Sequence, residues 1–379
     1  MKVETVLALN CGSSSLKFGL YSCGGKDPSV IAEGEAEEIG GSESKFWLRQ
    51  AKREGKEEER VFLPDHEAAL ESALDALRRA GTFAPQAIGH RFVHGGPGVR
   101  AHVRLTGEVL EDLRRAADYA PLHVPPALAV VEAVTKKLPR FPQAICLDTA
   151  CHSTMPDVAR TLALPEDVRR LGVERYGFHG LSVESIVAQL WPVPARLVIA
   201  HLGNGASITA VRDGRSIDNS MGLTPTGGVM MGTRSGDMDP GVLIYLMRHG
   251  YANAEKLEEI FDHRSGLLGI SGTTSDVRVL LTARKRDERA DLTLRMFCYQ
   301  VQKEIGAMAA ALGGLDTLVF TGGIGEHATE VREQISAGLK FLGTHETLVL
   351  SSQEDLQIAR ITEKLVGQDG SGAAKTVER

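Results

Sequence analysis

Two stretches of the sequence share one design, and they constrain the fold more than any other feature. In each, an apolar run leads into a turn of small residues and then into a second apolar run. The first is Val3–Tyr21 with the turn Asn10–Lys17, and the second is Leu197–Val211 with the turn His201–Ser207. Such runs around Gly- and Ser-rich turns predict β-hairpins. One hairpin of this design in each half of the chain predicts a duplicated architecture, with one copy per domain.

Short strands and helices alternate through the rest of the chain. The apolar residues of Asp65–Ala80 recur on one helical stripe, and Leu292–Leu312 is the longest helical pattern. Short apolar strands are predicted at Ala87–Val93, Gln143–Leu147 and Thr317–Phe320. This alternation predicts an α/β fold in which helices pack on mixed sheets.

The length and composition agree with ordinary globular domains. The chain has 379 residues, of which 42% are hydrophobic and 24% are charged. At about 100–200 residues per domain, that length predicts two domains, with three as the alternative. The stretch Glu33–Arg60 is dense in charge and poor in apolar residues, which predicts a solvated excursion or flap.

The charge balance, hydropathy and cysteines argue against several classes of protein. The formal net charge is −6, whereas nucleic-acid binders usually present clustered basic charge. No apolar run reaches the roughly 18 residues that a membrane span needs, and Glu4 interrupts any signal peptide. The five cysteines are odd in number and form no CxxC pair. They indicate reduced thiols in a cytoplasm and argue against disulfides or a zinc site.

Three turns have the composition of phosphate-binding loops. Asn10–Lys17, His201–Ser207 and Gly322–Glu326 each follow an apolar strand, and their small residues let the backbone approach an anion. None of them is a Walker A loop, and any one such turn is more often only a turn. Three of them in one chain, with Lys17 ending the first, favour a nucleotide bound between the domains.

Arginine, histidine and aspartate side chains gather in short Gly- and Pro-rich segments at predicted strand ends. Arginine binds carboxylate or phosphate with two parallel hydrogen bonds, histidine donates to developing charge, and aspartate holds a metal ion. Each residue alone is better explained as a local turn cap, but the group together predicts a site for an anionic substrate. His90 and His94 lack the carboxylate of a metalloprotease motif. The segments are His90–Gly96, Pro121–Pro126, Leu147–His152, Arg175–Gly180 and Met231–Asp237.

In their order along the chain, these segments resemble the successive motifs of the acetate kinases, from residue 1 to about 343. The matching motifs are Asn10–Lys17, His90–Gly96, Asp148–His152, Tyr176–Gly180, His201–Gly205, Gly232–Asp237 and Gly322–Glu326. The resemblance implies two duplicated actin/ribonuclease H-like α/β domains with a nucleotide cleft between them. It places these domains at 1–147 and 148–351, with 352–379 returning to the first.

The resemblance also implies a reaction, its co-substrates and an assembly. Acetate kinases transfer the γ-phosphoryl group of ATP directly and in line onto acetate, giving acetyl phosphate and ADP. Mg²⁺ is the expected metal, with Mn²⁺ as its substitute. A propionate- or butyrate-type carboxylate kinase is the related alternative. A homodimer is the expected assembly, and neither nucleic acid nor a membrane is an expected partner.

The expected catalytic residues follow from the motifs that they match. Arg91 and Arg234 are expected to hold the carboxylate and the phosphoryl group in transfer. His179 is expected to contact the transition state, with His123 assisting. Asp148 is the expected essential carboxylate. Because a carboxylate substrate is already a nucleophile at neutral pH, Asp148 is expected to act electrostatically or by orienting the metal rather than as a base.

The expected binding residues come from the same resemblance. Asn10, Asp148 and Glu354 are the expected metal site, and Gln353–Arg360 is expected to form a helix that returns to the first domain. The substrate methyl is expected to contact Val93, Leu122, Phe178 and Pro225. The expected nucleotide contacts are Ser13, Ser15, Lys17, His201, Leu202, Gly203, Asn204, Gly205, Asp276, Val277, Arg278, Gly322, Gly323, Ile324, Gly325 and Glu326.

Two other classes of function remain as alternatives. Thr321–Ala328 contains spaced glycines between a strand and a helix, as a dinucleotide-dependent oxidoreductase would. No acidic residue ends a second strand about 20 residues further on, which argues against that class. The second alternative is a non-catalytic nucleotide-binding protein. The joint presence of Arg91, Asp148, His179 and Arg234 argues against it.

Overall fold

The computed structural model describes residues 3–367, and the chain divides into two compact units. The first unit contains the chain up to Ala150 together with the segment that begins at Gln353. The second unit is Cys151–Ser352. The expected returning segment 352–379 extends beyond the described residues from position 368 onward. Within the described residues, no helix is both long and apolar enough to cross a membrane.

The first unit is built on a sheet of eight strands in the order β5-β4-β3-β2-β1-β6-β8-β7. Strands β1 to β5 form an antiparallel meander, and β6 and β8 then add to β1 in parallel. The strands are β1 (Thr5–Cys11), β2 (Ser15–Ser22), β3 (Ser29–Glu37), β4 (Ser44–Gln50), β5 (Glu57–Val61), β6 (Ala87–Phe92), β7 (Val103–Arg104) and β8 (Gln143–Leu147).

The second unit repeats this topology in a five-stranded sheet of order β11-β10-β9-β12-β13. An antiparallel meander again occupies one half, and two parallel strands complete the other. The strands are β9 (Arg196–Leu202), β10 (Ala206–Arg212), β11 (Arg215–Asn219), β12 (Thr317–Thr321) and β13 (Glu346–Val349). Because β3-β2-β1-β6-β8 and β11-β10-β9-β12-β13 share order and direction, the predicted duplication is confirmed.

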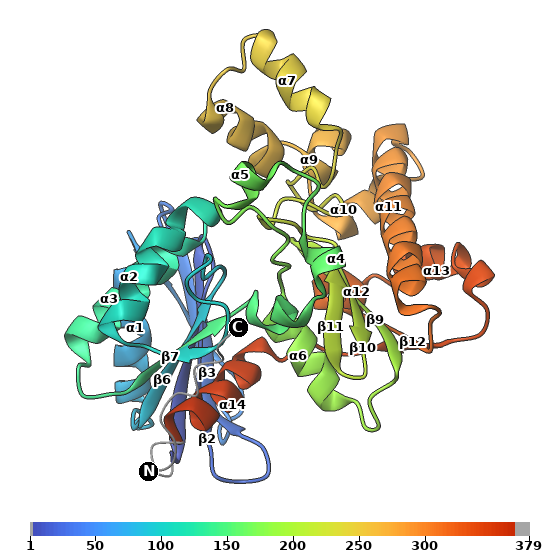
Figure 1. The fold of residues 1–379 in the computed structure, drawn as a ribbon. Coiled ribbons are helices and arrows are strands. Elements are labelled where there is room, and N and C mark those ends of the chain that lie inside the picture. The colour runs from blue at the N-terminus through green and yellow to red at the C-terminus, as the bar shows by residue number, and fades with distance from the viewer. Residues whose placement is uncertain (1–2, 368–379) are drawn as a thin grey trace. The chain divides into compact units, whose positions relative to one another are not determined.

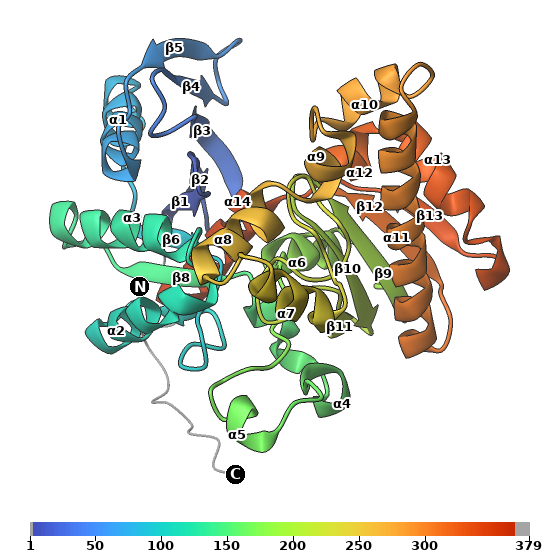
Figure 2. The same cartoon turned by 90° about the horizontal axis from the view of Figure 1, so that it is seen from above.

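The helices of the first unit lie on both faces of its sheet (Figures 1 and 2). Helices α1 (His66–Arg79) and α3 (Val124–Lys137) cover one face, and α14 (Glu354–Gly367) covers the other. The α1 helix begins where the Asp65 side chain accepts a hydrogen bond from the Ala68 N–H, as the sequence predicts for this segment. Helix α2 (Gly107–Arg115) precedes α3.

Helix α14 packs on β1, β6 and β8 and buries Ile358 and Ala359 completely. A glycine in β6 makes this approach possible. A Cβ atom at Gly89 would lie 2.1 Å from the Thr362 hydroxyl oxygen and 2.7 Å from an Ile358 methyl carbon. Any larger residue there would push α14 off the sheet.

The second unit places its longest helix, α11 (Glu288–Leu312), against β9, β10 and β11. Helix α6 (Gly180–Gln189) packs on the same sheet through a core in which its Val183 and Ile186 join Leu197 and Ile199 of β9. The remaining helices are α4 (Asp157–Arg160), α5 (Glu166–Arg169), α7 (Pro240–Arg248), α8 (Ala254–Glu258), α9 (Gly266–Ser271), α10 (Val277–Ala283), α12 (Gly322–His327) and α13 (Thr329–Ala337).

One prediction from charge density is wrong. Glu33–Arg60 is not a solvated flap, because it contributes most of β3, all of β4 and most of β5 to the sheet. Alternate side chains explain the error: Ala32, Ala36, Phe46 and Leu48 are buried, while the charged residues between them lie on the more exposed face. A strand with one solvated face carries this alternation, which an average over the segment conceals.

Candidate functional site

The first unit brings two predicted catalytic residues into direct contact. Arg91 lies near the end of β6, and Asp148 directly follows β8, the parallel neighbour of β6. Arg91 Nη2 is 2.7 Å and Nε is 3.1 Å from Asp148 Oδ2. The side chain of Asp148 is 2% exposed and that of Arg91 is 17% exposed. Parallel strands end at the same sheet edge, which explains why residues so far apart in sequence form one ion pair.

Asn10 joins this ion pair to the first turn of α14. Its Oδ1 accepts a hydrogen bond from Arg91 Nη1 at 3.3 Å. Its Nδ2 donates to Asp355 Oδ1 at 2.8 Å and to Glu354 Oε2 at 3.3 Å. The cluster therefore contains Arg91, Asp148, Asn10 and Glu354, all expected from the sequence, and also Asp355, which was not. The signal for Asp355 was its place beside Glu354 in the acidic first turn of the predicted helix.

The electrostatics of this cluster are dominated by burial. Burial raises the pKa of Asp148, and the positive charge and hydrogen bonds of Arg91 oppose that rise. Burial also raises the pKa of Asp355, while the hydrogen bond from Asn10 opposes it and Glu354 adds to it. For Arg91, the attraction of Asp148 and Glu354 outweighs the effect of burial and leaves its pKa above the ordinary value. The cation Arg91 thus faces three carboxyl groups, and Lys17 adds a further positive charge near Asp355.

The chemistry of this cluster fits a hard divalent cation. Among residues 3–367, no three histidine, cysteine, aspartate or glutamate side chains are grouped so that they could hold a metal ion. Mg²⁺, however, is usually held by one or two carboxylates together with waters and substrate phosphates. The oxygen donors of Asn10, Asp148, Glu354 and Asp355 match that requirement.

The turn between β1 and β2 is the first predicted phosphate loop. In the β1–β2 register, Asn10 pairs with Lys17, whose side chain is half exposed and lies 3.9 Å from Glu35. The Gly12 carbonyl accepts a hydrogen bond from His66 Nε2 at 2.9 Å, which ties the turn to the start of α1. Ser13 is exposed and Ser15 is partly buried. The turn therefore leaves its small residues accessible while its base is fixed.

The two other predicted phosphate loops lie side by side in the second unit. His201–Ser207 comprises the end of β9, the turn 203–205 and the start of β10. Gly322–Glu326 follows β12, the parallel neighbour of β9. The second of them is helical rather than a loop, since it forms most of α12. Gly322 has φ +76°, and a Cβ there would lie 2.8 Å from the Leu202 carbonyl oxygen. Glu326 Oε1 accepts from the Gly322 N–H at 3.1 Å, which closes this turn.

His179 and Arg234 converge on the His201–Gly205 loop. A Cβ on Gly205 would lie 3.2 Å from His179 Nε2 and 3.4 Å from Arg234 Nη1. His179 Nδ1 is 2.9 Å from Ser207 Oγ, and its ring stacks on His201 with 4.3 Å between centroids. Two predicted catalytic side chains and a predicted nucleotide loop therefore meet at a glycine, the residue that leaves most room for a ligand.

The other predicted site residues have local structural roles as well. His123 directly precedes α3, whose first residue is Val124, so the segment Pro121–Pro126 continues into a helix. Asp276 caps α10 through the Arg278 N–H and forms an ion pair with the exposed Arg278 side chain. That pairing lowers the pKa of Asp276 to about 2. Of the expected pocket residues, Val93 and Leu122 belong to the first unit, and Phe178 and Pro225 belong to the second.

Comparisons with known proteins agree with this arrangement. The model of the Acetokinase family matches residues 5–371. Acetate kinase from Bacteroides thetaiotaomicron is 42% identical over 354 residues, covering 89% of this chain and 88% of that protein. The crystal structure of Porphyromonas gingivalis acetate kinase is 36% identical with a TM-score of 0.85, covering 96% of this chain and all of that one.

A propionate kinase from Francisella tularensis has a similar fold. Its crystal structure is 34% identical with a TM-score of 0.89, and the match covers 96% of this chain and 100% of that chain. The match to the family model extends over nearly the whole sequence. It includes the cluster around Arg91 and Asp148 and the side chains that meet at the His201–Gly205 loop. The chain therefore belongs to the Acetokinase family.

Proposed function

We propose that this protein is an acetate kinase, which transfers the γ-phosphoryl group of ATP to acetate and releases acetyl phosphate and ADP. The observation that carries the proposal is the buried Arg91–Asp148–Asn10 cluster, in a chain that belongs to the Acetokinase family. The five cysteines are free thiols, which supports a cytoplasmic enzyme.

The residues supply the two things that phosphoryl transfer requires, namely positioning and neutralisation of charge. We assign Arg91 and Arg234 to the acetate carboxylate and the transferring phosphoryl group. His179 then donates from Nε2 to the phosphoryl oxygens in the transition state, and His123 assists. Asp148 orients Arg91 through the ion pair and removes no proton, because acetate is already ionised at neutral pH.

The remaining assignments concern the metal and the nucleotide. Asn10, Asp148 and Glu354 would hold Mg²⁺, which neutralises charge on the ATP phosphates when it is bound; Mn²⁺ would substitute for it. We assign the phosphates to Lys17, Ser13 and Ser15 in the first unit. The nucleotide contacts of the second unit are assigned to His201–Gly205, Asp276–Arg278 and Gly322–Glu326.

A hydroxamate-trapping assay tests this function directly. With ATP, Mg²⁺ and acetate, the purified protein should form acetyl phosphate, which hydroxylamine converts into a coloured hydroxamate. Omission of acetate should abolish the signal. ATP binding without any hydroxamate would contradict the proposal and would identify a nucleotide-binding protein that does not turn over.

The acyl-group preference should be graded. Val93, Leu122, Phe178 and Pro225 are small or medium apolar residues, and we assign them to the end of the substrate remote from the carboxylate. Because one methylene in such a pocket is worth about 1–3 kcal/mol, acetate and propionate should both be used and butyrate poorly. Values of kcat/KM for the three acids test this. Val93→Ala should shift the preference toward longer acids, and a wild-type preference for butyrate would contradict the assignment.

Glu354→Ala should raise the Mg²⁺ concentration needed for half-maximal velocity by about tenfold and lower kcat. The reason is that Glu354 contributes one of the carboxylates around Asn10. If Glu354 only complemented the dipole of α14, the variant would lose about 0.3–1 kcal/mol of stability with no change in the Mg²⁺ titration. The measurements are an Mg²⁺ titration of velocity and a melting curve. An unchanged titration would remove Glu354 from the metal site.

We also propose that the enzyme is a homodimer and that helix α7 lies in the interface between the two subunits. None of the nine residues of α7 is buried, although it presents Val242, Ile244, Tyr245 and Met247. Contiguous exposed apolar surface of this kind marks an interface between proteins. Ile244→Glu should therefore give a monomer in analytical ultracentrifugation. Val158→Glu, at a residue that is 91% exposed and outside α7, should leave the dimer intact. A dimer that survives Ile244→Glu would place the interface elsewhere.

A further inference from the structure

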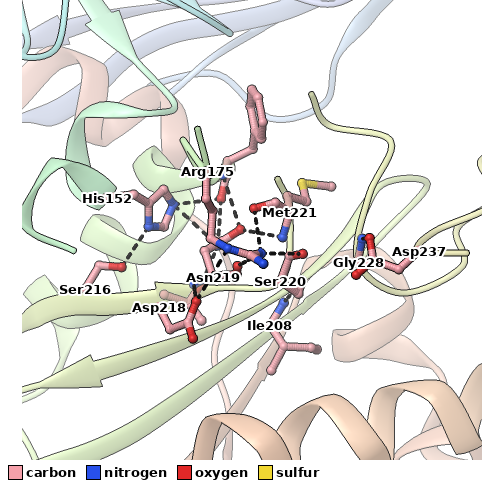
Figure 3. Close-up of polar contacts among 12 residues, drawn as sticks. His152, Arg175, Ile208, Ser216, Asp218, Asn219, Ser220, Met221, Gly228 and Asp237 are labelled. Carbon is pink, nitrogen blue, oxygen red and sulfur yellow. Dashed lines mark hydrogen bonds and ion pairs between the residues drawn. The ribbon is translucent and has the colours of Figure 1, made fainter. Parts of the chain in front are cut away.

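A buried group of polar side chains, which includes His152 and Asn219 (Figure 3), holds the peptide unit that precedes His179. His152 Nε2 is 2.9 Å from the Phe178 carbonyl oxygen. Asn219 Nδ2 is 3.3 Å from the same oxygen, and Asn219 Oδ1 accepts from the Phe178 N–H at 3.4 Å. His152, Asn219 and Phe178 are each at most 1% exposed. The backbone N–H and the backbone carbonyl of Phe178 are therefore both hydrogen-bonded to side chains from other segments.

The partners fix the proton positions in this group. The Phe178 carbonyl can only accept, so His152 Nε2 carries the proton. His152 Nδ1 then accepts from the Ser216 hydroxyl, whose oxygen is 2.8 Å away. Burial lowers the pKa of His152 to about 4, which keeps the ring neutral at physiological pH. His152 is thus a fixed hydrogen-bond donor and has no titration in the working range.

Asn219 is itself held firmly at the end of β11. Its Nδ2 also donates to Thr209 Oγ1 at 2.8 Å, and its Oδ1 also accepts from the Met221 N–H at 2.9 Å. Arg175 Nη1 donates to the carbonyl oxygens of Asn219, Ser220 and Met221 at 2.7, 3.1 and 3.3 Å. The amide that binds Phe178 therefore has a single orientation.

The backbone that this group holds has an uncommon conformation. Gly177 has φ +72° and His179 has φ +59°, so two left-handed residues flank Phe178. A positive φ is uncommon for a residue other than glycine, so contacts from the surroundings stabilise this conformation at His179. The contact is close, because a Cβ at Gly177 would lie 2.8 Å from His152 Cγ and 2.9 Å from Asn219 Cβ.

We propose that His152 and Asn219 are positioning residues that aim His179 at the reacting phosphoryl group. They do so by fixing the Phe178 peptide, and Ser207 then sets the ring itself through Nδ1. This inference rests on the proposed function, in which His179 contacts the transition state. Neither residue has to touch the substrate, so their loss should affect the rate of the chemical step rather than binding.

Kinetics of matched variants test the proposal. Asn219→Ala and His152→Ala should each lower kcat by about 100-fold, the effect of a displacement of roughly 1 Å in a catalytic group, with the KM values for acetate and ATP little changed. His152→Gln should recover part of kcat, since its side-chain amide can still donate to the Phe178 carbonyl. The control is Ser220→Ala. Ser220 is also buried, and its hydroxyl accepts from the N–H of Ile208 in β10 at 3.0 Å. The Ser220→Ala variant should have a lower melting temperature and an unchanged kcat.

A second measurement follows His179 without any turnover. Nitrogen-15 NMR of histidine-labelled protein, with His179 assigned from His179→Gln, should show one ring tautomer in the wild type and in Ser220→Ala. Asn219→Ala should show an averaged ring. Unchanged His179 signals in Asn219→Ala, or a kcat loss no larger than in Ser220→Ala, would overturn the proposal. Failure of the proposed function would appear separately, as a wild type that forms no acyl phosphate but still has the ordered His179 ring.

Discussion

Asp148→Asn is expected to lower kcat by about 100- to 1,000-fold, which is the typical loss when one preorganised electrostatic group is removed from an active site. Asparagine keeps the shape of the side chain and an oxygen that can accept from Arg91, but it removes the charge that orients the guanidinium. Nucleotide affinity should change little, because His201–Gly205 and Gly322–Glu326 lie in the second unit and contribute most of the proposed nucleotide contacts. Initial rates in the hydroxamate assay and ATP binding by calorimetry measure the two quantities.

The neighbouring histidine gives a control for damage to the strand. His90 is buried one residue before Arg91 on β6, and its Nε2 is 2.8 Å from Gln143 Oε1. His90→Gln should reduce stability and leave kcat near the wild-type value, since His90 faces Gln143 rather than the cluster. The assignment of Asp148 fails if the asparagine variant keeps more than about a tenth of the wild-type kcat, a barrier change of only about 1.4 kcal/mol.

Arg91→Met should produce the second large effect, a loss of about 1,000-fold in kcat, because an arginine that stabilises the transferring phosphoryl group contributes at least this much. Methionine is similar in length and carries no charge, so Asp148 is left buried without its cation. Breaking a buried ion pair in this way costs about 3 kcal/mol of folding stability. Both losses come from one substitution and are measured separately, by rates and by chemical denaturation.

The stability loss of Arg91→Met should depend on pH in a definite direction. Burial already raises the folded-state pKa of Asp148 above its ordinary value of 3.8, and Arg91 opposes that rise. Removing Arg91 raises the folded-state pKa further. A carboxyl group with a raised folded-state pKa favours folding below the unfolded pKa, and this contribution is lost as the pH rises through the folded value. The stability deficit of the variant should therefore grow from about pH 4 toward neutrality.

A double variant separates this linkage from simple loss of packing. Arg91→Met combined with Asp148→Asn keeps Glu354 and Asp355 but has no Asp148 carboxyl group to titrate. The pH dependence of its deficit relative to the wild type should therefore be clearly smaller than that of Arg91→Met. A deficit of Arg91→Met that stays constant with pH would show that the two side chains are not coupled in the folded protein.

Much of the fold could be predicted from the local spacing of apolar residues, because this spacing indicates which side of a strand or helix is buried. The strand predicted at Gln143–Leu147 has the same bounds in the structure, and Asp65–Ala80 contains α1 with Asp65 as its cap. The two hairpins and their repeated strand order follow from similar patterns. Glu33–Arg60 shows where this logic fails: with one sheet face in solvent, alternation carries the information and average charge does not.

For the candidate site, the identity of the residues and their orientation have different origins. The sequence by itself determined which residues are the candidates for the chemistry, because arginine, histidine and aspartate gather at strand ends beside glycines and their order matches the Acetokinase family. Only the tertiary structure decided how they are oriented. Asn10 meets Asp355 across 345 positions, and the Phe178 peptide meets Asn219 across 41. Contacts over such separations depend on strand register and helix docking, which bring the hydrogen-bond partners of buried polar groups together from distant segments. A short stretch of the sequence therefore does not reveal these contacts.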